Sequence, residues 1–151
     1  MRALIQRVTQ ARVTNEDDLS AQPASIEKGY VILLGVGCGD SEDEVKKLWS
    51  KIIKLRIFED DQGKTNLSLK EVEGSVLVVS QFTLYASCKK GNRPSFTDAG
   101  NPERAEALYR LFVECAREEG VYVQQGWFGA HMQISLVNDG PFTLWLDTDA
   151  L

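Results

Sequence analysis

Most apolar segments of the chain have the length and spacing of strands rather than helices. Apolar and polar residues alternate at 130–136, which is the pattern of a strand with one buried face. The run at 30–37 is apolar almost throughout and predicts a strand buried on both faces. The other predicted strands are residues 3–14, a short strand after the polar turn at 15–18, residues 75–84, residues 121–125 and residues 142–147.

Two segments instead repeat apolar residues at helical spacing. Ser41 and Glu44 form a capping box, in which each side chain can satisfy a free backbone N–H at the other's position, and they predict a helix over 42–55. Asn101 and Pro102 supply an N-cap and a proline in the first turn of a second helix. Strands outnumber the helices and do not alternate regularly with them. The pattern therefore predicts an α+β fold, a mostly antiparallel sheet or partly closed barrel with two helices packed on it.

Composition adds the size class and the compartment. The 151 residues fit one domain, residues 1–151, and an apolar content of 43% is enough to bury a sizeable core. No apolar run is long enough to span a membrane, and the first residues lack the features of a signal peptide. The three cysteines have no Cys-x-x-Cys spacing and are typical of reduced thiols. A cytoplasmic protein is expected, with no membrane partner.

The charge pattern limits contact with nucleic acid to local surfaces. A net charge of -5 argues against coating of nucleic acid through bulk charge, and DNA is not an expected partner. Residues 1–95 carry 14 basic and 13 acidic side chains, whereas residues 96–151 carry 3 and 9. Two basic groups fall in the first part: Lys46, Lys47, Lys51 and Lys54 on one predicted helix, and Lys89, Lys90 and Arg93 in a polar loop at 86–100. Either group could contact phosphate, although solvated surface is the simpler interpretation.

Conventional catalytic and cofactor motifs are weak in this sequence. Gly35, Gly37 and Gly39 lie between a strand and a helix, as in a dinucleotide-binding loop. Asp40 stands where that loop needs its last glycine, so a tight turn is the better interpretation. His131 is the only histidine and is expected on the exposed face of its strand. No histidine-based triad, metal cluster or cofactor is therefore predicted.

Two other segments are less easily explained as plain structure. Ser80-Gln81-Phe82-Thr83-Leu84-Tyr85 places hydroxyl and amide groups at the end of an apolar strand, which indicates either a strand that reaches solvent or a polar pocket. Asn138-Asp139-Gly140-Pro141 predicts a hairpin turn, because Asp-Gly favours one. A proline directly after that glycine is unusual, and X-Pro is the one peptide bond that readily becomes cis.

Together these segments resemble signatures of the D-aminoacyl-tRNA deacylase family, of the D-tyrosyl-tRNA deacylase type. The resemblance runs almost from end to end. It also includes Met1-Arg2-Ala3, Gln6-Arg7-Val8, Leu55-Arg56-Ile57-Phe58, Gly63-Lys64 and Arg93-Pro94-Ser95-Phe96. One segment departs from the family pattern: Trp127-Phe128-Gly129-Ala130-His131-Met132 stands where the family commonly has Arg-Phe-Gly-Ala-Asp-Met.

The resemblance implies a homodimer in which a cis Gly-Pro bond of one subunit reaches into the pocket of the other. The catalytic residues it implies are Ser80, Gln81, Phe82 and Thr83, which act through backbone and pocket contacts. The substrate-binding residues it implies are Gly140, Pro141, Arg7, which helps to hold the Gly-Pro loop, and Phe96. It implies no metal ligand.

The activity implied is hydrolysis of the ester bond of D-aminoacyl-tRNA, and also of mischarged glycyl-tRNA. Backbone N–H groups near Gln81 and Phe82 would stabilise the oxyanion, and the 2′-hydroxyl of the terminal adenosine would help to activate water. If the Gly140 and Pro141 carbonyls fix the substrate's α-ammonium, an L side chain clashes with the protein and a D side chain does not. Two other functions stay open: a hydrolase with Ser80 or Thr83 as nucleophile on another ester, and a non-catalytic RNA-binding domain, which the net charge disfavours.

Overall fold

The structure is a computed structural model that describes residues 1–151. Its strands are β1 (Arg2–Asn15), β2 (Ala24–Ile26), β3 (Gly29–Gly35), β4 (Arg56–Glu59), β5 (Thr65–Ser68), β6 (Ser75–Ser80), β7 (Val123–Gln125) and β8 (Met132–Asp147). Its helices are α1 (Glu42–Ile52) and α2 (Pro102–Glu118), with short 3-10 turns η1 (Phe82–Tyr85) and η2 (Thr148–Ala150).

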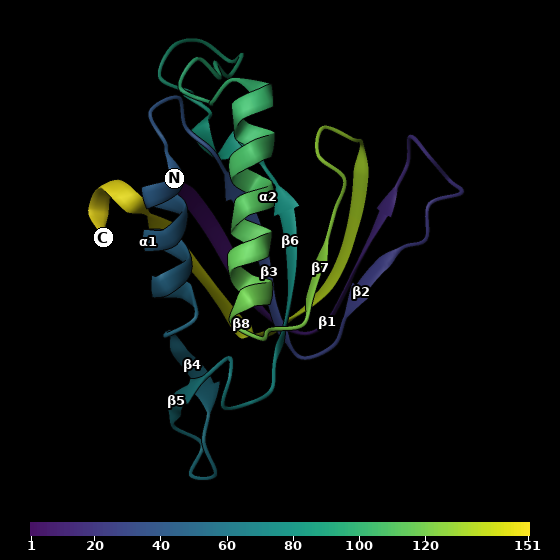
Figure 1. Ribbon diagram of the computed structural model, residues 1–151, viewed down its shortest axis with the longest axis vertical. Coiled ribbons are helices and arrows are strands. Elements are labelled where there is room, and N and C mark those ends of the chain that lie inside the picture. Colours follow the sequence, from purple (N-terminus) through teal and green to yellow (C-terminus); the bar gives the residue numbers. More distant parts are fainter.

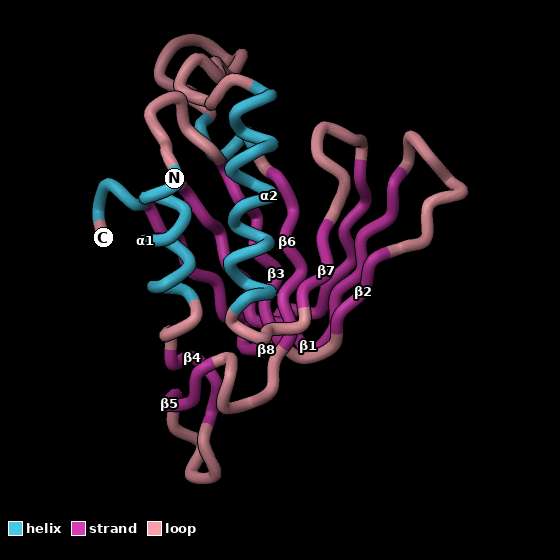
Figure 2. The backbone as a smooth tube through the Cα atoms, viewed as in Figure 1, coloured by secondary structure: helices cyan, strands magenta, loops and turns pink.

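The strands form a mixed, nearly closed, barrel-like sheet (Figures 1 and 2). β1 runs antiparallel to β2, β3 and β8, while β6 runs parallel to both β3 and β7. Each helix lies in the chain between two parallel strands, α1 between β3 and β6, and α2 between β6 and β7. The α+β class with two helices is confirmed, but one side of the sheet, formed by β3, β6 and β7, is parallel. Periodicity could not show this, because a strand buried on both faces is apolar in either orientation.

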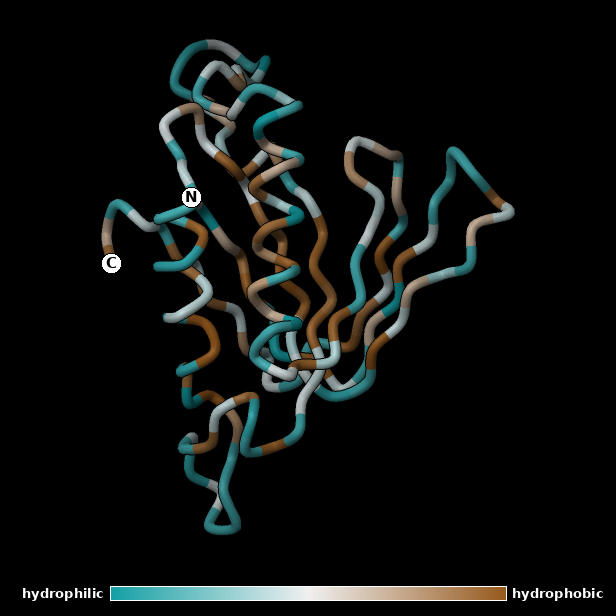
Figure 3. The backbone as a smooth tube through the Cα atoms, viewed as in Figure 1, coloured by the Kyte–Doolittle hydropathy of each residue, from teal (hydrophilic) through white to brown (hydrophobic).

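The two helices lie side by side and cover one face of the sheet (Figure 1). The capping box at Ser41 is present as predicted, and α1 buries Trp49 edge-on against Phe112 of α2, with ring centroids 5.6 Å apart. Apolar residues gather in β3 and β6 beneath the helices, whereas the tip of the β4–β5 hairpin is hydrophilic (Figure 3). α1 ends at Ile52, earlier than the predicted 42–55. Neither helix is long and apolar enough to cross a membrane.

Two further differences concern short segments. The polar turn at 60–63 joins β4 and β5 into a hairpin that the sequence did not predict. The strand predicted at 75–84 ends at Ser80, and the residues after it form η1. The alternating strand predicted at 130–136 is confirmed from Met132, where β8 begins, with its apolar residues half-buried; Ala130 and His131 lie before the strand.

The segment Asn138–Pro141 is not the hairpin turn that was predicted. β8 continues through it, and both flanking parts pair antiparallel with β1, so the chain does not reverse direction. Asn138 pairs with Val8 and Thr143 with Gln6, which leaves four residues of β8 opposite the single residue Arg7. The Asp-Gly turn preference is thus used to form a large bulge that projects from the strand. The prediction was wrong because turn propensity is local, whereas strand register is not.

Candidate active site

Backbone hydrogen bonds fix the strand end at Ser80. The Gln81 N–H donates to the Leu34 carbonyl at 2.8 Å, so it is already used within the fold. The first N–H groups of a 3-10 turn have no acceptor inside the turn, and in η1 these belong to Phe82 and Thr83. The free backbone N–H groups that could stabilise an oxyanion, expected near Gln81 and Phe82, are therefore those of Phe82 and Thr83.

A cavity of about 510 Å³ adjoins this strand end. Its volume lies within the usual range for small-ligand pockets. Four parts of the chain that are distant in sequence line it: Val36 after β3, residues 79–82 at the end of β6, Ala99, Gly100, Pro102 and Ala105 at the start of α2, and residues 128–132 with Ile134 at the start of β8. The predicted catalytic strand end therefore opens into a pocket rather than directly into solvent.

The segment before β8 was missed as part of the pocket. His131 is exposed, as predicted, yet it lies on the cavity wall close to the strand end. Its backbone N–H donates to the Asp17 carboxylate at 2.7 Å, which holds it in place. A Cβ at Gly126 would lie 2.6 Å from the Met132 sulfur, so the Met132 side chain packs directly on the backbone at this glycine. No group of three or more His, Cys, Asp or Glu side chains is placed to hold a metal ion.

An aromatic pair stands beside the polar groups of η1. Phe82 and Phe96 meet edge-on with centroids 5.0 Å apart, although their exposed fractions are 55% and 37%. The Gln81 side-chain amide donates to the Thr83 hydroxyl. The hydroxyl of Thr83 and the two exposed rings of Phe82 and Phe96 therefore lie close together beside the strand end at Ser80.

Tyr109 of α2 anchors the helix to β6 just before the strand end. Burial raises the pKa of Tyr109 well above its usual value, so its hydroxyl stays protonated and can donate. It donates to the Val78 carbonyl at 2.9 Å. Its ring also contacts Phe128, with centroids 5.9 Å apart. One side chain therefore joins α2, β6 and the segment before β8, all of which contribute to the cavity wall.

The glycine-rich turn at the end of β3 packs closely against η1. A Cβ at Gly35 would lie 3.0 Å from the Gln81 carbonyl oxygen, and one at Gly37 would lie 2.6 Å from the Tyr85 hydroxyl. These glycines are needed for close approach within the fold, which supports the tight-turn interpretation. Gly39, by contrast, faces open space.

The first two residues of the chain hold η1 in place through polar contacts. The α-ammonium of Met1 is buried and binds the Asp40 carboxylate at 2.6 Å, and the other oxygen of that carboxylate accepts the Gly37 N–H at 2.6 Å. Burial raises the pKa of Tyr85, whose protonated hydroxyl donates to the same carboxylate at 3.3 Å. Arg2 donates to the Leu84 carbonyl at 3.0 Å. The N-terminus thus contributes directly to the placement of the strand end.

The bulge of β8 is held by Arg7, as predicted. Arg7 is 5% exposed and donates to the carbonyls of Asp139, at 3.0 Å, and Ile57, at 2.6 Å. Its guanidinium also pairs with the Asp139 carboxylate at 3.2 Å and lies over the ring of Phe142. The Gly140–Pro141 bond is cis, and both residues are exposed.

Within one chain the bulge and the cavity are separate. Arg7 of β1 pairs with Tyr30 of β3, which in turn pairs with Val76 near the start of β6. Ser80, at the other end of β6, pairs with Leu34. Val76 and Ser80 are four residues apart on β6, which corresponds to roughly 13 Å. No residue of the bulge lines the cavity. The structure therefore assembles the predicted residues into two groups, one around Ser80 and one around Arg7.

Comparison with known proteins gives the family. A family model described as D-Tyr-tRNA(Tyr) deacylase matches residues 4–147. The chain belongs to this deacylase family. Proteins named D-aminoacyl-tRNA deacylase from Fervidobacterium nodosum and Thermotoga petrophila are 53% and 50% identical to it. The first alignment covers 98% of this chain and 97% of the relative, and the second 100% and 99%.

Two solved structures are similar to this member of the deacylase family. One, titled c-Myc DNA Unwinding Element Binding Protein, is 39% identical, with a TM-score of 0.87 over 97% of this chain and 98% of that one. The other, titled as a probable eukaryotic D-amino acid tRNA deacylase, is 17% identical, with a TM-score of 0.82 over 96% and 97%. At that identity the second likeness supports the fold alone.

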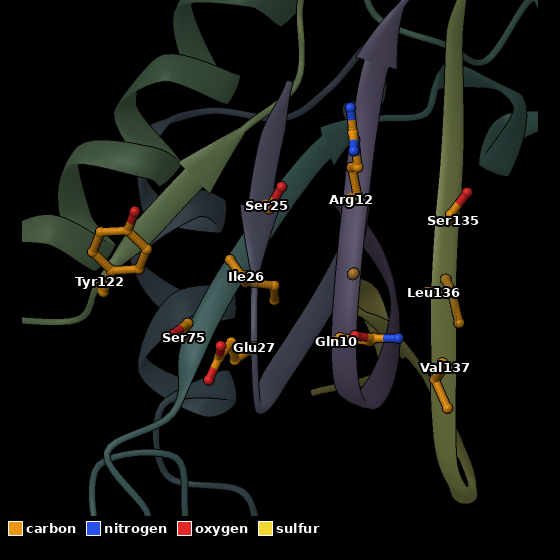
Figure 4. A pocket seen from close by; sticks show the side chains of 11 residues that line it. Gln10, Arg12, Ser25, Ile26, Glu27, Ser75, Tyr122, Ser135, Leu136 and Val137 are labelled. Carbon is orange, nitrogen blue, oxygen red and sulfur yellow. The ribbon is translucent and has the colours of Figure 1, made fainter. Parts of the chain in front are cut away.

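The deacylase-family chain also has a second, larger hollow of about 760 Å³ (Figure 4). Gln10 and Arg12 of β1 and Ser135 of β8 lie on one side of it, and Ser25 of β2 and Tyr122 lie on the other. Ser75 at the start of β6 also lines it, so it lies at the opposite end of that strand from Ser80. It contains none of the predicted site residues, and the cavity beside Ser80 is the better candidate active site.

Proposed function

We propose that this protein hydrolyses the ester bond of D-aminoacyl-tRNA and releases the free D-amino acid and tRNA. The observation that carries the proposal is similarity over almost the whole chain, at about half of all positions, to proteins named D-aminoacyl-tRNA deacylase. The cavity beside Ser80 supports it, because the family-like strand end forms a wall of a pocket of suitable size. We also propose a cytoplasmic location.

The chemistry needs little from side chains, because an aminoacyl ester is already activated. A water oxygen attacks the carbonyl carbon, the carbon–oxygen bond to the ribose breaks, and the 3′-oxygen of the tRNA takes a proton. The 2′-hydroxyl of the terminal adenosine helps to activate the water. The N–H groups of Phe82 and Thr83 stabilise the negative oxygen that forms. The exposed rings of Phe82 and Phe96 offer a surface on which the adenine can stack.

Selection for D-amino acids requires the second group of residues. In the proposed homodimer, Gly140 and Pro141 of one subunit enter the cavity of the other and bind the α-ammonium of the substrate through their carbonyls. An L side chain then points into protein and is excluded, whereas D side chains and glycine fit. Two features support this arrangement: the bulge projects and is exposed, and Arg7 fixes its shape from a buried position.

The alternative of a serine or threonine nucleophile has less support. The Thr83 hydroxyl accepts a hydrogen bond from the Gln81 amide, which does not activate it by removing a proton. His131 lines the same cavity, but it forms no side-chain hydrogen bond with Ser80 or Thr83. A purely RNA-binding role is also less favoured, because the net charge is -5.

The proposal is tested by incubating tRNA charged with a D-amino acid with the purified protein and measuring the fraction still esterified. Turnover of many substrate molecules per protein is expected. Binding of the tRNA without loss of the ester would contradict the enzymatic proposal, and a stable ester trapped on Thr83 would contradict the mechanism.

A further inference from the structure

The loop between η1 and α2 carries an isolated cluster of positive charge. Lys89, Lys90 and Arg93 are all exposed, and none of them forms an ion pair or a side-chain hydrogen bond. Mutual backbone hydrogen bonds between Ser87 and Ser95, at 2.7 and 2.9 Å, close the base of the loop, so residues 88–94 project from the molecule. In a protein of net charge -5, three unpaired cations on one short loop create a local positive potential that attracts anions.

This loop stands at the edge of the candidate active site. Phe96, one residue after the loop base, packs on Phe82, and Gly100 lines the cavity and donates to the Val36 carbonyl at 2.9 Å. In Figure 1 the loop lies beyond the N-terminal end of α2, the end that contributes Pro102 to the cavity. The loop is therefore connected to the cavity wall through the contact of Phe96 with Phe82 and through Gly100.

The other basic group, on and just after α1, differs in two ways: three of its four lysines have partners, and none of the four lines the cavity. Lys46 pairs with Glu42 at 3.6 Å, and Lys47 donates to the Thr148 carbonyl at 2.7 Å. Lys54, two residues after the end of α1, donates to the Ser50 hydroxyl at 3.1 Å. Lys51 has no ion pair or side-chain hydrogen bond, but no residue of α1 lines the cavity. Of the two basic groups in the sequence, only the loop has unpaired charges beside the site.

We propose that the loop 88–93 binds phosphates of the single-stranded 3′ end of the tRNA, next to the terminal nucleotide whose ester lies in the cavity. This inference rests on the proposed function, which places that nucleotide at Ser80. The phosphates just before an esterified adenosine must leave the cavity at its rim, and Lys and Arg side chains bind them as charged donors. The acceptor end is thereby held without reading its sequence.

The test compares two substrates that share the ester but differ in phosphates: D-tyrosyl-tRNA and D-tyrosyl-adenosine. For the double variant Lys89→Ala/Lys90→Ala, kcat/KM on the tRNA substrate should fall roughly tenfold at low salt, and the slope of log kcat/KM against log salt should decrease by roughly 1.4. Its kcat/KM on D-tyrosyl-adenosine should be unchanged. The matched control, Lys46→Ala/Lys51→Ala on α1, should behave like wild type on both substrates.

The outcomes separate this inference from the proposed function. Wild-type activity with an unchanged Lys89→Ala/Lys90→Ala variant would overturn the loop as the phosphate-binding surface. Equal losses on both substrates would also overturn it, because the loop would then act on the cavity itself. A wild-type protein that hydrolyses neither substrate would overturn the proposed function, and this inference with it.

Discussion

The contact between Gly35 and the strand end allows a sharp test of how the backbone contributes to catalysis. A Cβ at residue 35 would lie 3.0 Å from the Gln81 carbonyl oxygen and 3.1 Å from the Cβ of Leu84. That carbonyl belongs to the same peptide group as the Phe82 N–H, one of the two proposed oxyanion donors. Gly35 does not have a positive φ, so Gly35→Ala adds the steric contact without backbone strain. The substitution therefore displaces the donor without replacing any polar side chain of the site.

The expected effect follows from the size of the displacement. The Gln81 peptide must move by a few tenths of an ångström. Complete loss of one oxyanion donor costs about 10²–10³ in kcat, so partial misplacement should cost about 10–100-fold, or about 1.4–2.7 kcal/mol of barrier. Overpacking should reduce the free energy of unfolding by about 1–3 kcal/mol, which a folded domain tolerates.

Gly39→Ala is the matched control, because no heavy atom lies within 4 Å of a Cβ at that position. Deacylation of D-aminoacyl-tRNA should be measured for both variants under single-turnover conditions, with circular dichroism to verify folding. A large loss of kcat in Gly35→Ala and none in Gly39→Ala is expected. Equal rates in two folded variants would refute the role assigned to the Gln81–Phe82 peptide.

Three further results are expected. Asp40→Asn removes the negative charge that pairs with the buried Met1 ammonium, and breaking such a pair costs about 3–5 kcal/mol of unfolding free energy. The Tm should fall by on the order of 10 °C, whereas the control Asp61→Asn, at an exposed residue, should leave Tm unchanged. Thr83→Ala should retain substantial deacylation in rate assays, since its side chain is not the nucleophile; a loss of many powers of ten would indicate otherwise. Gly140→Ala, whose Cβ would lie 2.9 Å from the Phe142 nitrogen, should be inactive alone. Mixing its subunits with those of Gly35→Ala should restore about a quarter of wild-type activity, because about half of the dimers are then mixed and one of their two sites is intact; no recovery would argue against a site shared between subunits.

The parts of the fold that the sequence predicted are those set by local chemistry. Ser41 with Glu44, and Asn101 with Pro102, satisfy free N–H groups within one helical turn, so both helix starts could be located. The parallel pairing of β6 with β3 and β7 could not be located, because it depends on where α1 and α2 return the chain. Neither could the bulge at Gly140, which exists only because both halves of β8 pair with β1.

The candidate site divides in the same way. The strand end at Ser80 could be predicted because polar groups follow an apolar run. Arg7 and Gly140 could be predicted only through the resemblance to a known family. The cavity wall at His131 could not be found, because an exposed strand residue and a cavity residue have the same local pattern. The support that Met1 gives to Asp40 depends on a contact between residues 39 positions apart.

The most direct test of the account is the rate of ester hydrolysis for one tRNA charged with D-tyrosine, L-tyrosine or glycine, each corrected for spontaneous hydrolysis. The account predicts rapid loss of the D-tyrosyl and glycyl esters and no loss of the L-tyrosyl ester above background. Comparable enzymatic rates for D- and L-tyrosyl-tRNA would contradict it.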